Sequence, residues 1–407
     1  TLFGNGGYSP TIAALALGAI LFVPTVILLA AVSPMLAKNL IRRLERSAEA
    51  VGTLSAVGTV GAIAGAVATG MFLVPYFGVD MIILGVALSL IACGLLLHGK
   101  DFRTFAVFLA YAASAAFFLN TLPTKADGWL AEVSSSYNRI IVTEDSADGG
   151  TRAVWTSPFG MQCQMYVDRE GRADESRLSN AVVRAHDILI TALFSEGPRR
   201  ALFLGGCVAA FPRYLARNHP GMEADVVEID SAMTEVARDY FGFDEASFPA
   251  ISVIHEDART FVNGDHVPYD LVYVDAFDSS GNVPFHLVTK EMFARLREHV
   301  EDEGLLVMNT YGSYEGLGLA YPAVFVKTAR SAFRYVALYQ FTGKPMKSQN
   351  LIIAASNGHE LPDALTDSRY PGLTLTRVET PDNVIVLTDD YAPVGGLLPL
   401  QKLIIAK

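Results

Sequence analysis

Four long apolar segments lie in the first 122 residues and limit the fold more than any other feature of the chain. They cover residues 10–37, 51–75, 79–98 and 104–122, and Asp80 is the only ionised side chain between positions 50 and 97. A helix of about 20 apolar residues spans the roughly 30 Å hydrocarbon core of a bilayer, whereas a cleaved signal peptide has one short apolar stretch. The pattern predicts an α-helical transmembrane bundle of about four helices over residues 1–122.

The charge of the chain divides at the same place. Residues 1–122 hold six Lys or Arg and four Asp or Glu, whereas the rest holds 25 basic and 38 acidic residues, a net charge of −13. This acidic part disfavours nucleic acid as a partner and favours small cations. The basic residues of the first part follow the first and third apolar segments, as in cytoplasmic loops. With four spans, residues after 122 emerge on the opposite side of the membrane.

The three cysteines do not form a recognisable framework. Cys93 lies inside an apolar segment, and Cys163 and Cys207 are far apart in the sequence. None has the spacing of a metal site, and the eight histidines are scattered. We therefore expect no disulfide framework and no metal.

From about residue 123 the pattern changes to short strands and helices. Residues 134–145, 151–157 and 161–168 have the composition of strands, and residues 176–194 have helical apolar spacing. We interpret residues 123–195 as a small antiparallel β unit followed by a connecting helix.

Residues 196–407 repeat a strand-then-helix order. The predicted strands are rich in Val, Leu and Ile without alternation, which suits a parallel sheet covered on both faces. This order predicts an α/β doubly wound domain, Rossmann-like and of methyltransferase type. The predicted strands are 200–206, 224–230, 251–257, 269–277 and 304–310.

Acidic side chains stand at the ends of three of these strands. Glu228 ends the second strand, Asp257 the third, and Asp275 and Asp278 the fourth. One such residue is usually a cap or turn former, but ligands of these sheets bind beyond the carboxyl ends of the strands. Four carboxylates together indicate a binding site, and Glu228 is placed to bind both hydroxyls of a ribose.

The first strand ends in "GGCVAAF", small residues that let the backbone approach a ligand. A Walker lysine and a clear G-x-G-x-x-G are absent from the sequence, so a phosphate cradle is not predicted. A nucleoside without phosphates, such as an S-adenosyl sulfonium compound, fits these residues better than NAD or ATP.

Residues 130–400 resemble spermidine synthase and related aminopropyltransferases. The resemblance lies in "SSSYNRIIV", "LGG" with "VEID", "HEDAR", "YDLVYVDAFD" and "LVTKEMFARLREHVEDEGLLVMN". "VDAFDSSGNVPFHLVTKEMF", "LTDDYAPV" and the apolar segments around "SPMLAKNLIRRLERSAEAVGTLSAVGTVGAIAGA" are similar to a bacterial branch in which membrane spans precede a spermidine-synthase-like domain.

The resemblance implies a role for each matching residue. Asp275 would orient and deprotonate the attacking amine, and Asp278 would anchor its other ammonium. An ammonium cannot attack carbon, so the site must accept a proton, and the sulfonium supplies the leaving group without a metal. The nucleoside would contact Asn138, Gly205, Gly206, Glu228, Asp230, Asp257 and Ala258, and Tyr137 and His186 would contact the amine substrate. Apart from the resemblance, His286, Asp389 and Asp390 are candidates to line a different acceptor pocket, and a helix cap or solvated turn is left open for each.

The chain departs from the family pattern beside the expected amine. Val208 stands where the family has an Asp that meets the aminopropyl amine, and Ala185 stands in place of a Tyr. Cys207, Ala209 and Ala210 replace glycines of the same loop. These changes leave the nucleoside contacts and weaken the expectation of decarboxylated S-adenosylmethionine and putrescine as the substrates.

We expect a membrane-anchored aminopropyltransferase-like enzyme that uses decarboxylated S-adenosylmethionine and an amine and releases 5′-methylthioadenosine. Two alternatives are left open. One is an enzyme acting on S-adenosylmethionine itself, by methyl or aminocarboxypropyl transfer or as a lyase, and the other is a nucleoside-binding sensor or transporter.

The expected partners are a small cationic amine and the lipid bilayer, and a homodimer is left open. The expected location is the bacterial inner membrane. The basic loops put the catalytic domain in the periplasm, whereas supply of the cosubstrate puts it in the cytoplasm. The sequence starts at Thr1, and a further span upstream would reconcile the two.

Overall fold

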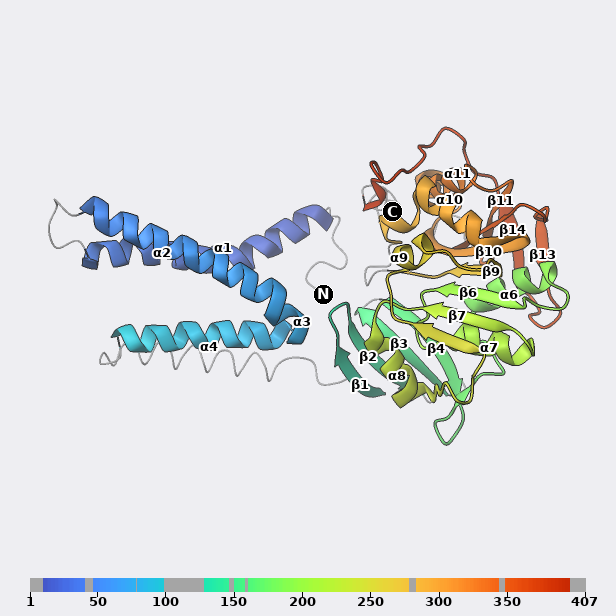
Figure 1. Ribbon diagram of the computed structural model, residues 1–407, viewed down its shortest axis with the longest axis horizontal. Coiled ribbons are helices and arrows are strands. Elements are labelled where there is room, and N and C mark those ends of the chain that lie inside the picture. Colours follow the sequence, from blue (N-terminus) through green and yellow to red (C-terminus); the bar gives the residue numbers. More distant parts are fainter. Residues whose placement is uncertain are drawn as a thin grey trace. The chain divides into compact units, whose positions relative to one another are not determined.

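The computed structural model describes residues 10–40, 47–77, 79–98, 128–145, 150–157, 160–277, 283–343 and 348–395. The chain divides into two compact units, Thr1–Ser114 and Ala115–Lys407 (Figure 1). The domain limits that the sequence predicts, after residues 122 and 195, stay predictions.

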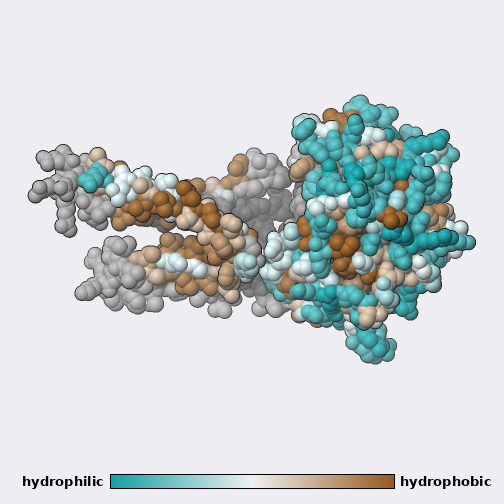
Figure 2. Space-filling model, viewed as in Figure 1, coloured by the Kyte–Doolittle hydropathy of each residue, from teal (hydrophilic) through white to brown (hydrophobic). Residues whose placement is uncertain are grey.

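The first unit is helical where it is described. Its elements are α1 (Pro10–Leu40), α2 (Ser47–Ala68), the π-helical turn η2 (Thr69–Leu73), α3 (Val74–Tyr76) and α4 (Val79–His98). Hydrophobic side chains cover much of α2 and α4 in Figure 2, and large apolar residues of α2 such as Val60 and Ile63 are exposed.

One helix of the described part, Ala48–Leu73, is long and apolar enough to cross a membrane, with a mean hydropathy of 1.8. Leu29–Lys38 and Met81–Cys93 are shorter apolar helices. The fourth predicted span, residues 104–122, lies outside the described residues. The four-helix transmembrane bundle therefore stays a prediction.

The second unit begins with an antiparallel sheet of five strands in the order β1-β2-β3-β4-β5. The prediction of one strand over 134–145 is wrong at its start, because the Ser135 N–H donates to the Asn138 carbonyl at 2.8 Å and closes a turn between two strands. The strands are β1 (Trp129–Ser134), β2 (Arg139–Asp145), β3 (Thr151–Ser157), β4 (Gly160–Val167) and β5 (Ala173–Asp174).

The larger sheet has nine strands in the order β13-β14-β11-β12-β10-β9-β6-β7-β8. Strands β10, β9, β6, β7 and β8 run parallel to one another, and β12, β11, β14 and β13 continue the sheet in antiparallel fashion. The predicted Rossmann-like, methyltransferase-type fold is confirmed. The bounds are β6 (Arg200–Leu204), β7 (Glu223–Val227), β8 (Ile251–Ile254), β9 (Tyr269–Val274), β10 (Val300–Gly312), β11 (Tyr335–Gln340), β12 (Gln349–Ser356), β13 (Ala364–Thr366) and β14 (Thr374–Val378).

Successive residues of the parallel strands point to opposite faces, and each face has its own core. Phe203 and Tyr273 join a cluster with α6, α7, α8 and the small sheet, whereas Leu204 and Val274 join a cluster with α9, α10 and α11. The helices are α6 (Ala181–Leu193), α7 (Ala210–Asn218), α8 (Ser231–Phe241), α9 (Ala258–Asn263), α10 (Lys290–His299) and α11 (Ala320–Ala329), with the 3₁₀ turns η4 (Phe285–Leu287) and η5 (Gly316–Leu319).

Candidate active site

The turn after β6 approaches the end of β9 so closely that only glycine fits. Gly205 has φ +93°, and a Cβ on it would lie 2.4 Å from the carbonyl oxygen of Asp275. A Cβ on Gly206 would lie 2.4 Å from Cγ1 of Val226. Gly205 therefore brings the turn against the strand end that bears Asp275, and Gly206 brings it against β7.

Glu228 follows β7 and holds this turn from the other side. Its Oε2 accepts the Gly206 N–H at 3.1 Å and the Cys207 N–H at 3.2 Å, and its Oε1 accepts the Asp230 N–H at 3.0 Å. Burial raises the pKa of Glu228, and these backbone donors oppose the shift. A carboxylate fixed in this way keeps lone pairs, above all on Oε1, for the hydroxyls of a ribose.

The turn between β1 and β2 is tied to the same edge of the large sheet. Asp230, the N-cap of α8, is buried, and its Oδ2 accepts from Ser135 Oγ at 2.6 Å and from Asn138 Nδ2 at 3.2 Å. Asn138 and Asp230 are thus brought together as expected for one site. Tyr137 is exposed beside them, and Ser135 is a contact that the sequence did not identify.

Asp275 is partly buried just after β9, between two donors. Asn309 Nδ2 donates to its Oδ1 at 2.9 Å, and the Tyr273 hydroxyl donates to its Oδ2 at 3.2 Å. Burial raises the pKa of Asp275 to about 6, against the lowering effect of the two donors. Its carboxylate is therefore a stronger proton acceptor than an ordinary aspartate. Tyr273 and Asn309 were not predicted.

His186 does not line the surface of the site as the predicted substrate contact requires, because it is buried behind Tyr273. It is fully buried, and its Nδ1 is 2.9 Å from the Tyr273 hydroxyl oxygen. Because the single hydroxyl proton of Tyr273 is donated to Asp275, the Nδ1–H of His186 must be the donor in the second bond. Burial lowers the pKa of His186 to about 3, so the ring is neutral. Within the described residues, His186 is therefore linked to Asp275 only through the hydroxyl of Tyr273.

Asp257, the N-cap of α9, faces His286. The Thr260 N–H donates to Asp257 Oδ1 at 3.0 Å, and His286 Nε2 lies 3.6 Å from its Oδ2. Both side chains are partly exposed, and Ala258 is buried behind them. This pair lies at the mouth of the neighbouring strand, β8, as the predicted adenine site requires.

Both residues of the late acidic pair, Asp389 and Asp390, are exposed, but they differ in their contacts. Asp389 Oδ2 accepts from Arg259 at 2.7 Å and its Oδ1 accepts from Thr289 Oγ1 at 2.6 Å, so its carboxylate is already engaged. Each oxygen keeps a lone pair, and substrate binding by Asp389 stays a prediction. Asp390 is exposed, and Asp278 lies outside the described residues.

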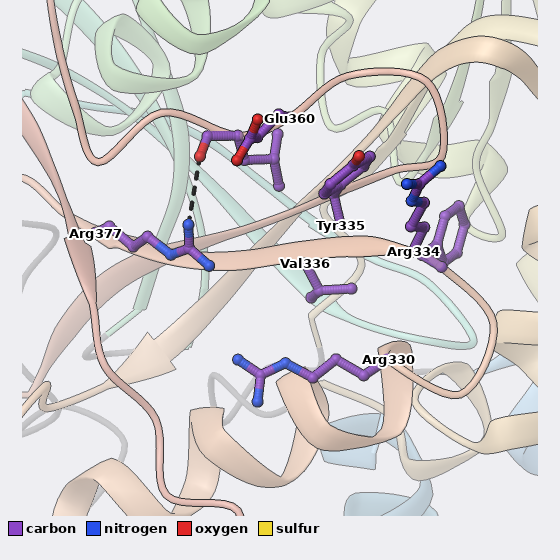
Figure 3. A pocket seen from close by; sticks show the side chains of 8 residues that line it. Arg330, Arg334, Tyr335, Val336, Glu360 and Arg377 are labelled. Atoms are coloured by element: carbon purple, nitrogen blue, oxygen red, sulfur yellow. Dashed lines mark hydrogen bonds between the residues drawn. The ribbon is translucent and has the colours of Figure 1, made fainter.

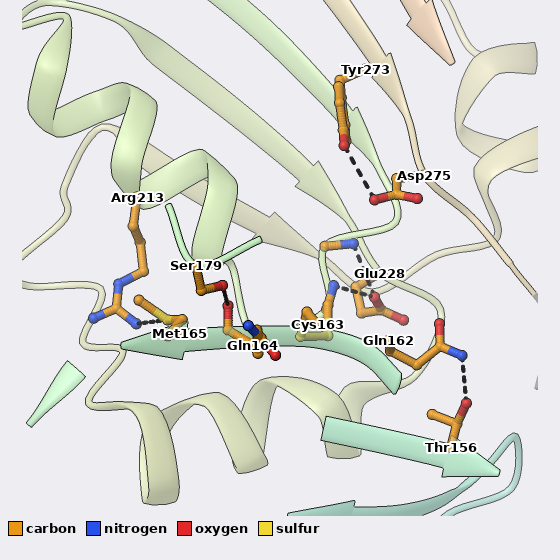
Figure 4. The surroundings of a disulfide bond; sticks show 12 residues. Thr156, Gln162, Cys163, Gln164, Met165, Ser179, Arg213, Glu228, Tyr273 and Asp275 are labelled. Carbon is orange, nitrogen blue, oxygen red and sulfur yellow. Dashed lines mark hydrogen bonds between the residues drawn. A yellow bond between two sulfur atoms is a disulfide. The ribbon is translucent and has the colours of Figure 1, made fainter. Parts of the chain in front are cut away.

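The expectation about the cysteines is wrong. Cys163 of β4 and Cys207 of the turn after β6 form a disulfide, with their Cα atoms 6.5 Å apart (Figure 4). Sequence distance gave no hint, because the fold of the small sheet is what brings β4 beside this turn. Cys93 is a free cysteine. The described residues contain no cluster of His, Cys, Asp or Glu suited to a metal ion.

A cavity of about 330 Å³ lies at the opposite edge of the sheet (Figure 3). Its lining includes Tyr335 and Val336 at the start of β11. Strand β11 is parallel to β10, because both are antiparallel to β12, so its first residues lie at the amino ends of the parallel strands. The cavity is far from the strand ends described above. Arg330, Arg334, Arg377 and Glu360 supply its charged lining, and two of these arginines have acidic partners, Asp382 and Asp363.

Residues 185–362 match the sequence profile of the spermine/spermidine synthase domain. The match covers these residues, less than half of the chain, and supports the family that the sequence predicts. Its curated relatives include a polyamine aminopropyltransferase of Vibrio vulnificus, 27% identical over 50% of this chain and 72% of that protein. Another, from Corynebacterium efficiens, is 28% identical over 65% of this chain and 52% of that protein. The predicted family and enzyme class, an aminopropyltransferase-like transferase, are confirmed.

Other matches cover smaller parts of each protein. A probable polyamine aminopropyl transferase of Bifidobacterium longum is 33% identical over 32% of this chain and 28% of that protein. The solved structure of a probable spermidine synthase from Corynebacterium glutamicum aligns with a TM-score of 0.48 at 20% identity, covering 61% of this chain and 85% of that chain. Several relatives are thus matched over less than two thirds of their length, and the membrane-fused branch stays a prediction.

Proposed function

We propose that this protein transfers the aminopropyl group of decarboxylated S-adenosylmethionine to a small amine and releases 5′-methylthioadenosine. The observation that carries this proposal is the placement of Asp275. Its carboxylate, with a pKa raised to about 6, stands at the strand end against which the Gly205 turn packs. A proton acceptor beside a nucleoside turn is the arrangement that amine alkylation needs.

The nucleoside is held by residues along the carboxyl ends of β6, β7 and β8. Glu228 binds the ribose hydroxyls, and Asn138 with Asp230 borders the nucleoside from the small sheet. Asp257 accepts a hydrogen bond from the exocyclic amine of the adenine, with Ala258 packed against the ring. Gly205 lets the turn pack directly against the backbone of Asp275, which brings the nucleoside turn next to that carboxylate.

The chemical step uses Asp275 as the proton acceptor. The amine nitrogen attacks the aminopropyl carbon next to sulfur, a C–N bond forms, and the C–S bond breaks with its electron pair going to sulfur. The surplus proton on nitrogen passes to Asp275. A base of pKa about 6 cannot fully deprotonate a free ammonium of pKa about 10, so proton transfer accompanies attack. His186 and Tyr273 fix the carboxylate rather than touch the amine.

The amine is bound by negative charge near this edge. Asp278 and Asp390 stay candidates for its distal ammonium, with His286 and Tyr137 as further lining residues. Val208 is fully buried in the core, so it supplies no polar contact where the family pattern has an Asp. The amine is therefore proposed by class, as a small cation, and not as putrescine in particular.

The first unit anchors the enzyme in the bacterial inner membrane. This part of the proposal is supported by the apolar helix Ala48–Leu73, whose large side chains face outward, and by the uncharged sequence from 50 to 97 apart from Asp80. The bilayer is thus its expected partner, and dimer formation is left to measurement.

Mass spectrometry of the products tests the reaction. The full-length protein in detergent is incubated with decarboxylated or intact S-adenosylmethionine, each with and without putrescine or other diamines. We expect methylthioadenosine only when the decarboxylated ligand and an amine are both present. Methylthioadenosine from the intact ligand would instead indicate chemistry on its aminocarboxypropyl arm, and S-adenosylhomocysteine would indicate methyl transfer.

The Asp275→Asn variant tests the role of the carboxylate. It keeps the size of the side chain and removes the proton acceptor, so turnover should fall by about 10² to 10⁴ while methylthioadenosine still binds. Asp265→Asn is the matched control, because Asp265 is fully exposed with a single long contact to Arg295 at 3.8 Å. Equal activity of the two variants would exclude Asp275 as the base.

A further inference from the structure

The disulfide joins two parts of the second unit at the nucleoside site. Cys163 belongs to β4 of the small sheet, and Cys207 follows directly after Gly205 and Gly206, 44 positions later in the sequence. Both side chains are partly buried against the core on this face of the large sheet. Figure 4 shows two backbone nitrogens directed at the carboxylate of Glu228, those of Gly206 and Cys207.

Cys207 itself takes part in holding Glu228. Its backbone N–H donates to Glu228 Oε2 at 3.2 Å, next to the N–H of Gly206. The position of the Glu228 carboxylate thus depends on the conformation of the same residue whose sulfur is bound to β4. A restraint on Cys207 is a restraint on the proposed ribose ligand.

The conformation of this turn needs such a restraint. Cys207 has φ +44° and Ala209 has φ +54°, and they are the non-glycine residues with positive φ in the described part of the chain. Side chains with a Cβ rarely adopt this region, and such residues persist where the surroundings hold them in place. Ala209 precedes α7 without a side-chain cap, and its N–H donates to the Gly206 carbonyl at 2.8 Å. The disulfide adds a covalent link to this turn.

We propose that the Cys163–Cys207 disulfide is the positioning element of the nucleoside site, so that the oxidised protein is the working form. This inference rests on the proposed function, because it assumes a nucleoside at Glu228. Reduction by a dithiol transfers two electrons and two protons to the cysteines, gives two thiols and converts the reductant to a disulfide. Cys207 is then free to leave its left-handed conformation, and the amides of Gly206 and Cys207 no longer fix Glu228.

A working disulfide also places the second unit in an oxidising compartment. Structural disulfides persist in the periplasm and outside the cell and are rare in the cytosol. In the periplasm a disulfide-bearing oxidoreductase accepts the two electrons when the bond forms. The basic residues after the first and third apolar segments independently put residues beyond 122 on that side. A nucleoside cosubstrate made in the cytoplasm must then cross the membrane to reach the site.

Thiol trapping in native membranes tests whether the bond is present in cells. Free thiols of the full-length protein are blocked with a maleimide, the protein is reduced, and newly released thiols receive a mass tag. We expect two tags, on the peptides that contain Cys163 and Cys207, and a blocked Cys93. If Cys163 and Cys207 are both blocked before reduction, the proposal is overturned, whatever the enzyme's activity.

Nucleoside binding tests the positioning role. Calorimetry measures Kd for 5′-methylthioadenosine with oxidised and dithiothreitol-reduced protein, and we expect binding about tenfold weaker after reduction because the turn must then be ordered on binding. Cys93→Ser should keep this response, and the Cys163→Ser/Cys207→Ser variant should bind weakly in both conditions. An unchanged Kd on reduction would overturn the proposal and leave the proposed function standing, whereas no binding by the oxidised protein would overturn both.

A glycine variant separates positioning from mere stability. Glycine adopts φ +44° without strain, so Cys163→Ser/Cys207→Gly should bind methylthioadenosine more tightly than Cys163→Ser/Cys207→Ser, although neither has a disulfide. The melting temperatures of both variants are measured in parallel. Equal Kd values for the two variants would show that the conformation of residue 207 does not set the affinity.

Discussion

Asp275 combines a raised pKa with a complete set of hydrogen-bond donors. Burial stabilises its protonated form, while Asn309 and Tyr273 stabilise its carboxylate, and the balance leaves a pKa of about 6. Above that pH the carboxylate is free to accept a proton, and below it the group is protonated. The enzyme should therefore lose activity as the pH falls through about 6, in contrast to a base with the ordinary aspartate pKa of about 4.

Removal of the Asn309 side chain should raise the pH at which activity is lost on acidification, the acid limb of the pH–rate profile. The Asn309→Ala variant deletes the donor to Asp275 Oδ1, so the carboxylate is less stabilised and its pKa rises by about 1 unit. The measurement is kcat/KM for the amine between pH 5 and 9, and the midpoint of the acid limb should shift upward. Asn357→Ala is the control, because Asn357 accepts from the Arg334 N–H at a distant turn. A lower rate with an unmoved midpoint would mean that Asn309 has only a structural role.

The turn from β6 into α7 is the element that connects Asp275, Glu228 and the small sheet. It touches Asp275 through Gly205, binds Glu228 through two amides, and is joined to β4 through Cys207. Its sequence has glycine at the two positions where neighbouring atoms leave no room for a Cβ, and it carries Cys207 and Ala209 at positive φ. This turn is thus restrained by a covalent bond as well as by its hydrogen bonds.

Substitution of Gly205 measures how tightly this element packs. In Gly205→Ala the new Cβ meets the Asp275 carbonyl oxygen at 2.4 Å, so we expect a loss of about 3 kcal/mol or more in the free energy of unfolding. Gly221→Ala is matched to it, because Gly221 has nearly the same φ, +97°, with nothing within 4 Å of its Cβ position. That control should lose only about 1 kcal/mol. Similar losses in urea unfolding would contradict a tight contact.

The sequence predicted the order of elements in the second unit better than their contacts. Strand-rich runs followed by helical spacing were enough to place Glu228, Asp257 and Asp275 at one edge, because parallel strands end together. Tyr273 could have been found, since it lies two positions before Asp275 on the same face of the strand. Asn309 could not, because its contact depends on the register in which Met308 pairs with Val274.

Long-range pairing also explains the missed disulfide. Cys163 and Cys207 approach each other only after the small sheet packs against the face that carries α7. Nothing in the spacing of the cysteines contains that information. The contacts of Asp389 could not be predicted for a related reason, because its partners Arg259 and Thr289 are more than 90 positions away in the sequence.

At the scale of the whole molecule, the chain joins an acidic enzyme to an apolar helical unit. The side chains of Val60 and Ile63 on α2 are 67% and 61% exposed, and exposure of so many apolar residues to water is unfavourable by about 25 cal/mol for each Å². Lipid removes this unfavourable exposure. The same helices lack the ionisable residues that mark a transport path in membrane spans, apart from Asp80 between positions 50 and 97.

Membrane extraction tests whether this unit is inserted in the bilayer. The full-length protein should sediment with membranes, remain there after washes in high salt and in alkaline carbonate, and be released by detergent, because an inserted helix is held by its apolar surface and not by charge. A peripheral protein would be released by salt or carbonate, since surface attraction is screened by ions. Recovery of the chain in either wash, with its enzymatic activity intact, would reject the anchor and leave the apolar surface of α2 to be covered by protein instead.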